Sequence, residues 1–206
     1  MANQVELPDD VEFWSRQLTE HALFLHLLFQ EEPWRSQAKS LYDLWQSPGG
    51  DVERKTTELV AFKELALARL KSGAWLGWCL PSFLEHILFE AKYFRARIGA
   101  GTLASGDCAA WSTIVLGHAL IGPKLIDPNV EREDAAAGVA SSIARLMGCC
   151  PSPNHDCLSQ LDKEFQKTNT WVRGLPSATH IVPPTLAAHI LRENDRGSLM
   201  VKKIGQ

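Results

Sequence analysis

The chain lacks any apolar run of the roughly 18–20 residues that a membrane-spanning helix needs. It also lacks an excess of basic residues, because 21 Lys and Arg stand against 24 Asp and Glu and give a formal net charge of −3. The chain therefore has no strong electrostatic attraction to a phosphate backbone, and we expect no nucleic-acid partner. Residues 1–14 are polar and acidic, which argues against a secretory signal. Together these absences predict a cytoplasmic protein without a membrane partner.

Cysteine is present in a small and odd number, at irregular spacing. The simplest interpretation of the five cysteines is reduced thiols in a reducing compartment. A second interpretation is a small metal site between Cys149 and Cys157 that also uses Cys150 and His155, although this spacing matches no standard zinc pattern. The remaining two cysteines are Cys79 and Cys108.

Strand signals are scarce, and residues 179–182 form the only short β-like stretch. Helical periodicity covers most of the chain, with apolar residues three or four apart. A glycine-rich break at residues 99–107 lies near the middle of the 206 residues. We therefore predict an all-α protein with about eight helices in two groups of four. The expected helices cover residues 9–31, 33–46, 51–71, 81–97, 108–122, 129–147, 157–172 and 183–203.

Two short motifs occur twice, in the same order. The motif Trp-Ser-x5-His-Ala-Leu at residues 14–23 recurs at 111–120, and Pro-x4-His-Ile-Leu-x-Glu at 81–90 recurs at 184–193. Two matches in one consistent alignment argue against chance and predict an internally duplicated, pseudo-twofold bundle. The predicted repeats are residues 1–103 and 104–206, which we expect to form one compact unit.

The repeat separates four of the seven histidines from His26, His155 and His180, which have no counterpart. A histidine and a glutamate four residues apart lie on one face of a helix, so each Pro motif supplies a convergent pair. A histidine from a facing helix completes two imidazoles and one carboxylate, the composition that suits non-haem Fe(II) and also Mn, with Zn possible. The two predicted sets of metal ligands are His21, His86 and Glu90, and His118, His189 and Glu193.

Other interpretations of these residues remain open. A single His-x3-Glu pair is ordinarily a surface hydrogen bond, but here the pair recurs among apolar residues, where a buried imidazole and carboxylate need a partner. The ligands could form two mononuclear sites or one dinuclear centre on the pseudo-twofold axis, and the modest chain length favours the shared centre. Trp14 and Trp111, each two turns before a histidine, are interpreted as core packing.

The two halves differ beside their histidines. Glu20 precedes His21, whereas Gly117 precedes His118, and Glu85 precedes His86, whereas Ala188 precedes His189. Glu20 could bridge two metals, orient an imidazole, serve as a base or lie in solvent. We name Glu20 as the candidate catalytic residue.

These motifs resemble those of the DUF2935 family, whose members have a Trp…Glu-His-Ala segment and a Pro-Leu…His-x3-Glu-Ala segment in each half. The segment at residues 125–128, Leu-Ile-Asp-Pro, also resembles a recurrent Leu-Asp-Pro of that family. The resemblance spans most of the chain through a few short motifs. Gly117 stands where the family has Glu, and Asn194 stands where Ala is usual. The resemblance implies a ferritin-like or related metal-binding bundle without a settled activity.

From the ligand composition we expect an oxidoreductase that activates oxygen at Fe or Mn, one or two ions, with oxygen or a small molecule as its substrate. One alternative is a metal-binding or storage protein without catalysis. Another is a zinc-type hydrolase that uses metal-bound water as its nucleophile.

Overall fold

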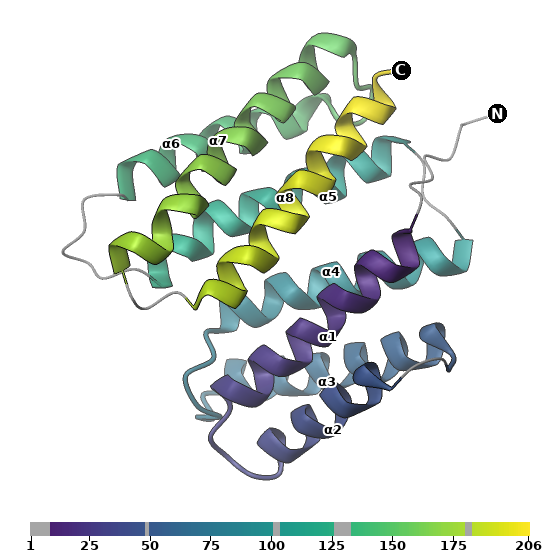
Figure 1. Ribbon diagram of the computed structural model, residues 1–206, viewed down its shortest axis with the longest axis vertical. Helices are drawn as coiled ribbons and strands as arrows, with labels where there is room; N and C mark the ends of the chain where they lie inside the picture. The colour runs from purple at the N-terminus through teal and green to yellow at the C-terminus, as the bar shows by residue number, and fades with distance from the viewer. Residues whose placement is uncertain (1–8, 48–49, 101–103, 126–132, 180–182) are drawn as a thin grey trace. The chain divides into compact units, whose positions relative to one another are not determined.

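A computed structural model describes residues 9–47, 50–100, 104–125, 133–179 and 183–206. The predicted all-α class is confirmed, because the described residues contain eight α-helices, two short 3-10 helices and one isolated bridge in place of any strand (Figure 1). The α-helices are α1 (Asp10–Leu28), α2 (Trp34–Gln46), α3 (Val52–Lys71), α4 (Pro81–Ala100), α5 (Ala104–Ile121), α6 (Glu133–Leu146), α7 (His155–Thr179) and α8 (Pro184–Ile204). Among the described helices, none combines the length and the apolar content that crossing a membrane requires.

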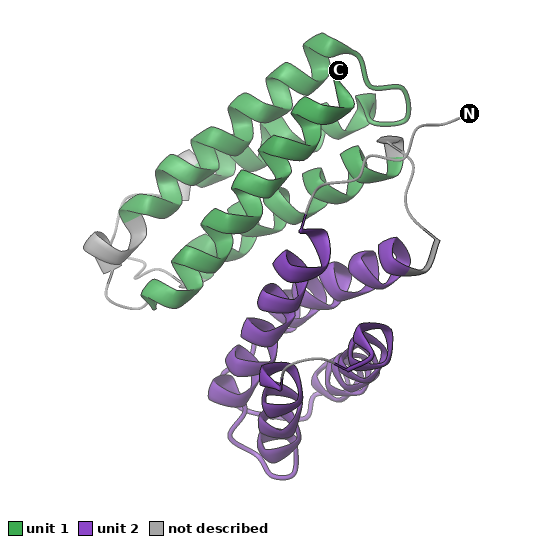
Figure 2. Cartoon of the chain, turned by 45° about the vertical axis from the view of Figure 1, so that its right-hand side comes forward, with its two compact units in different colours: residues 1–6, 102–206 green, residues 7–101 purple. Residues whose placement is uncertain are grey.

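The chain divides into two compact units, coloured separately in Figure 2. Helices α1–α4 lie in one unit, called here the N-terminal unit, and helices α5–α8 lie in the other, the C-terminal unit. The boundary predicted between residues 103 and 104 lies at the start of α5. Duplication of one unit from the other stays a prediction from the sequence.

In the N-terminal unit, α1 packs on α2 and α3 packs on α4. Trp14 of α1 is fully buried and stacks on Phe94 of α4 at a centroid distance of 5.7 Å, as expected for core packing. The segment between α3 and α4 passes close to the end of α1, where a Cβ on Gly77 would lie 2.3 Å from the Leu28 carbonyl oxygen. Gly77 also has a φ of 135°, so glycine is required here on both counts.

In the C-terminal unit, α8 packs against both α5 and α7. Trp111 of α5 is 1% exposed and, as predicted, belongs to the core. It lies so close to Gly197 of α8 that a Cβ there would be 3.2 Å from Trp111 Cε3. Between α7 and α8, Asn169 donates a hydrogen bond of 2.6 Å to Asp195. Gly197 allows α8 to approach α5 closely, and the hydrogen bond between Asn169 and Asp195 links α8 to α7.

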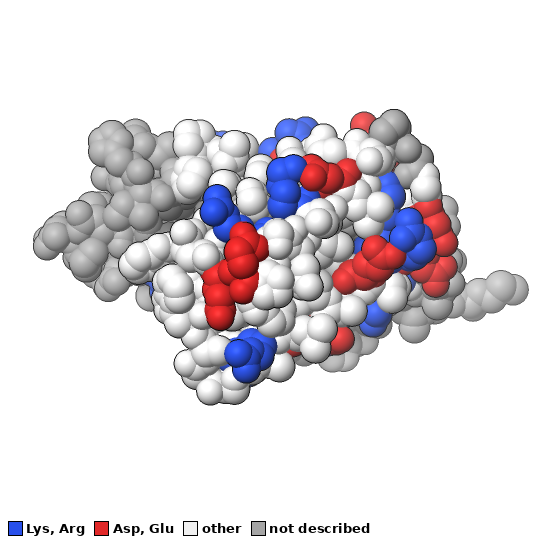
Figure 3. Space-filling model, turned by 90° about the horizontal axis from the view of Figure 1, so that it is seen from below, with Lys and Arg blue, Asp and Glu red and all other residues white. Residues whose placement is uncertain are grey.

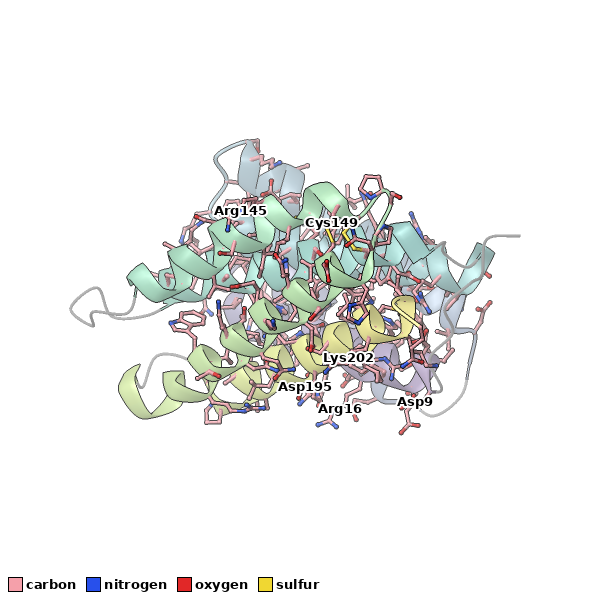
Figure 4. The ribbon with its side chains drawn as sticks, turned by 90° about the horizontal axis from the view of Figure 1, so that it is seen from above. Asp9, Arg16, Arg145, Cys149, Asp195 and Lys202 are labelled. Carbon is pink, nitrogen blue, oxygen red and sulfur yellow. A yellow bond between two sulfur atoms is a disulfide. The ribbon has the colours of Figure 1, made fainter. Side chains whose placement is uncertain are left out.

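Two disulfides in the C-terminal unit correct the interpretation of the cysteines. Cys108 of α5 is bonded to Cys150, and Cys149, labelled in Figure 4, is bonded to Cys157 of α7. Cys79 is free and buried. The prediction of reduced thiols is therefore wrong for four cysteines. The alternative Cys/His metal site is also wrong. Its three cysteines form disulfides, so they offer no thiolate to a metal, and the His155 side chain is 85% exposed. The cytoplasmic location stays a prediction.

Helix ends differ from the sequence-based expectation near glycine and proline. The break expected at residues 99–107 is shorter, because α4 continues to Ala100 and α5 begins at Ala104. Helix α7 continues to Thr179, past the expected end at residue 172. Val172 packs with Ala187 and Ile190 of α8, and this packing outweighs the weak local signal of single residues. The predicted β-like stretch begins inside α7, and its residues 180–182 lie outside the described residues.

Candidate metal centre

The first triad, His21, His86 and Glu90, comes together inside the N-terminal unit. His21 lies on the buried side of α1, whereas His86 and Glu90 occupy successive turns of α4. His21 Nε2 is 2.9 Å from Glu90 Oε2, and His86 Nε2 is 2.7 Å from Glu90 Oε1. Each carboxylate oxygen thus faces one imidazole. The side chains of His21 and Glu90 are fully buried and that of His86 is 8% exposed.

Lys63 of α3 completes this network, and the sequence interpretation missed it. Lys63 is fully buried, its Nζ lies 3.0 Å from His21 Nδ1, and it donates a hydrogen bond of 2.7 Å to the Ile87 carbonyl. A signal was present in the sequence, because Lys63 is four residues after Leu59 and three before Ala66, both core residues. A lysine at a core position of an amphipathic helix is unusual and demands a buried partner.

The second triad, His118, His189 and Glu193, comes together inside the C-terminal unit from α5 and α8. His118 Nε2 is 3.1 Å from Glu193 Oε2, and His189 Nε2 is 3.3 Å from the same oxygen. Both imidazoles are 3% exposed and the carboxylate is fully buried. In contrast to the first triad, the two imidazole nitrogens converge here on one carboxylate oxygen.

Asn194 contacts the other face of His118. Its amide oxygen lies 2.7 Å from His118 Nδ1, and its side chain is fully buried. In the sequence alignment of the two halves, Ala91 stands in the place of Asn194. The sequence marked this position as a departure from the DUF2935 pattern but gave it no role, because only the fold brings α5 beside α8.

All six side chains of the two triads belong to buried or nearly buried groups of His and Glu that could hold a metal ion. Each triad presents two imidazole nitrogens and a carboxylate, a mixed N/O donor set that suits Fe, Mn or Zn. A buried carboxylate needs positive charge or hydrogen-bond donors nearby, and a metal ion meets this need for all three side chains at once. The residues present could therefore hold a metal ion.

The predicted catalytic residue, Glu20, lies apart from this buried cluster. Its side chain is 22% exposed and its carboxylate is 3.4 Å from Arg16 Nε, one turn back on α1. In Figure 4, Arg16 points away from the helices. Glu85 forms an ion pair with Lys71 at 2.5 Å. A catalytic role for Glu20 stays a prediction.

The histidines without a counterpart lie elsewhere. His26 Nδ1 is 3.1 Å from the Arg35 carbonyl oxygen in an exposed contact, and His155 is exposed beside Asp156. His180 lies outside the described residues. On the face shown in Figure 3, basic and acidic side chains form small neighbouring groups, and the expectation of no nucleic-acid partner stays a prediction.

Three comparisons with known proteins show what the chain is similar to. No family model matches the chain. Uncharacterized protein L567 of Acanthamoeba polyphaga mimivirus is 29% identical over 126 residues, and the match covers 46% of this chain and 39% of the viral protein's length. The crystal structure of an uncharacterized protein from Bacillus cereus G9241 matches with a TM-score of 0.81 at 16% identity, over 92% of this chain and 87% of that chain. At that identity the likeness shows the helical fold alone, and membership of DUF2935 stays a prediction.

Proposed function

We propose that this protein binds a transition-metal ion, Fe or Mn, through its His/His/Glu triads and acts as an oxidoreductase that activates oxygen. The observation that carries the proposal is the convergence of His118 Nε2 and His189 Nε2 on one buried oxygen of Glu193, at 3.1 and 3.3 Å. Two imidazoles and one carboxylate leave open coordination positions on such an ion, where oxygen or a substrate can bind. The family resemblance also favours this proposal.

The binding step is tested by elemental analysis of purified protein reconstituted with Fe(II), Mn(II) or Zn(II). We compare the wild type with His86→Ala and His189→Ala, one variant in each triad. His26→Ala is the matched control, because it removes a half-buried histidine of α1 that lies outside both triads and contacts a backbone carbonyl. Metal content is expected to fall in the triad variants and to stay unchanged in the control.

Unchanged metal content in both triad variants would contradict the proposal. Unfolding curves of the variants exclude loss of metal through loss of the fold. Electron paramagnetic resonance of the Mn(II)-loaded protein then separates a coupled pair of ions from isolated ions, the two arrangements that the sequence leaves open.

Oxygen activation is tested separately, with an oxygen electrode and the Fe(II)-loaded protein in the presence of a reductant. Oxygen uptake that is lost in His189→Ala is the expected result. Tight Zn(II) binding without oxygen uptake would contradict the oxidoreductase and favour the hydrolase alternative.

A second candidate is a metal-binding protein without catalysis, which the burial of the triads favours. The histidine and glutamate side chains of the second triad are at most 3% exposed, so a substrate has little direct access in this conformation. A large loss of thermal stability on chelation together with no oxygen uptake would support this candidate over the enzyme.

A further inference from the structure

The two triads differ in the group that contacts Nδ1 of the histidine from the facing helix. For His21 this group is the Lys63 ammonium at 3.0 Å, and for His118 it is the Asn194 amide oxygen at 2.7 Å. A neutral imidazole has a hydrogen on one ring nitrogen and a lone pair on the other. The group that contacts Nδ1 therefore determines whether Nε2 presents a hydrogen or a lone pair. The difference at Nδ1 therefore changes the state of Nε2, the nitrogen that would bind the metal.

The contact with Asn194 prepares His118 to bind a metal. An amide oxygen only accepts hydrogen bonds, so His118 Nδ1 donates to it and Nε2 keeps its lone pair. That lone pair faces Glu193 Oε2 at 3.1 Å, and a shared cation, either a metal ion or a second proton on the imidazole, satisfies both electron-rich atoms. Metal-ligating histidines commonly hold their second N–H against an oxygen in this way.

The contact with Lys63 has the opposite effect on His21. A lysine ammonium has three donors and no acceptor, so His21 Nδ1 accepts from it while Ile87 accepts another of its hydrogens. The imidazole then carries its hydrogen on Nε2, which lies 2.9 Å from Glu90 Oε2. A metal ion that binds His21 Nε2 must first displace this hydrogen.

We infer that the two triads are unequal metal sites. The second triad, oriented by Asn194, binds the ion tightly, and Lys63 weakens the first triad by keeping the Nε2 hydrogen of His21 directed at Glu90. This inference rests on the metal binding proposed above. Lys63 and Asn194 are positioning residues, because each acts through a histidine.

The inference is tested by titrating metal-free protein with Co(II) and following its visible absorption. We expect one tight ion per chain and a second that binds at least roughly tenfold more weakly. Asn194→Leu should weaken the tight site roughly 10- to 100-fold, the usual effect of losing such a supporting contact. Asn194→Asp keeps an oxygen acceptor and should restore the tight site.

Lys63→Met should tighten the weaker binding event about tenfold, since it removes the donor from His21 Nδ1 at similar side-chain length. Lys55→Met is the matched control. Lys55 is also a buried lysine of α3, but its ammonium donates to the Ser47 carbonyl, away from both triads. It should leave both binding events unchanged.

The tautomers are read directly by two-bond 1H–15N correlation spectra of the metal-free wild type. We expect the hydrogen of His118 on Nδ1 and that of His21 on Nε2, and a shift of the His21 tautomer in Lys63→Met. This measurement separates positioning from general structural support, and the wild-type spectra decide the point even if Lys63→Met fails to fold.

Two equally tight ions, or a His21 hydrogen on Nδ1 in the wild type, would overturn this inference and leave the proposed metal binding intact. Absence of any tight ion in the wild type would instead overturn the proposed function.

Discussion

Two triads of the same composition have different side-chain contacts in the two units. In the first, the two oxygens of Glu90 each face one imidazole and Lys63 extends the network. In the second, two imidazoles approach one oxygen of Glu193 and a neutral amide lies behind His118. Identical residue types therefore do not give identical sites. The group that contacts one ring nitrogen determines whether the other nitrogen presents a hydrogen or a lone pair.

The largest expected effect concerns the buried charge of the first triad. In metal-free protein, Glu90→Leu should lower the free energy of unfolding by about 3–5 kcal/mol, since it leaves the network containing buried Lys63 without its anion. Glu193→Leu should lower the free energy of unfolding by less, because the group that contacts His118 Nδ1 is the neutral amide of Asn194. Urea unfolding measures both, and Glu90→Leu combined with Lys63→Met should recover part of the loss. Equal costs for the two glutamates would contradict the comparison.

The disulfides should stabilise the C-terminal unit alone. Replacing Cys108 and Cys150 together by Ser removes a crosslink across a sequence separation of 42 residues, and replacing Cys149 and Cys157 removes one across 8. Loop-closure entropy predicts losses of up to about 4 and about 2.5 kcal/mol, respectively. Hydrogen exchange measures these losses unit by unit. Equal losses in the N-terminal unit would contradict the assignment of each crosslink to one unit.

A smaller effect is expected where the two tryptophans pack. Trp14 stacks on Phe94, whereas Trp111 lies against Gly197, the position aligned with Phe94. Gly197→Ala should lower the free energy of unfolding by about 1–3 kcal/mol, because the added Cβ would lie 3.2 Å from Trp111. Gly138→Ala in α6 is the control, since its Cβ meets nothing within 4 Å and should be neutral or stabilising. Thermal unfolding compares the two variants, and an equal effect would be contrary to this expectation.

The smallest effect concerns Cys79, the one cysteine of the N-terminal unit. Burial raises the pKa of its thiol from 9.0 to about 12, so the native protein should not react with a thiol reagent at pH 8. Its contribution to the free energy of unfolding is complete below pH 9 and is lost as the pH rises towards 12. Thiol counts should be none in the native protein, one after unfolding, and five after unfolding with reduction. Five thiols without a reductant would exclude the disulfides.

Periodicity and repetition were sufficient to predict the helices and the grouping of each triad. His and Glu four apart must share a face of α4 or α8, so the pairs at residues 86/90 and 189/193 followed from helix geometry alone. Pairing with His21 and His118 required only that the Trp motif and the Pro motif lie on facing helices. The structure brings these groups together, while their role as metal ligands stays a prediction.

What the sequence interpretation missed depends on contacts between distant elements. Lys63 reaches His21 across 42 positions and Asn194 reaches His118 across 76. The local pattern places Lys63 on the core side of its helix, but it does not reveal the partner of either residue. The disulfides were missed for a similar reason, because odd number and irregular spacing do not reveal which sulfurs the fold brings together. Helix ends near Gly174 were misplaced because packing outweighed local propensity.

The adjacency of Cys149 and Cys150 gives the C-terminal unit an uncommon covalent connectivity. The two disulfide rings overlap at this pair, one closing on Cys108 and the other on Cys157. A protease that cuts once anywhere between residues 108 and 157 therefore leaves a single covalent molecule until a reductant is added. One cut in the N-terminal unit separates the chain into two pieces on a denaturing gel, since Cys79 has no disulfide.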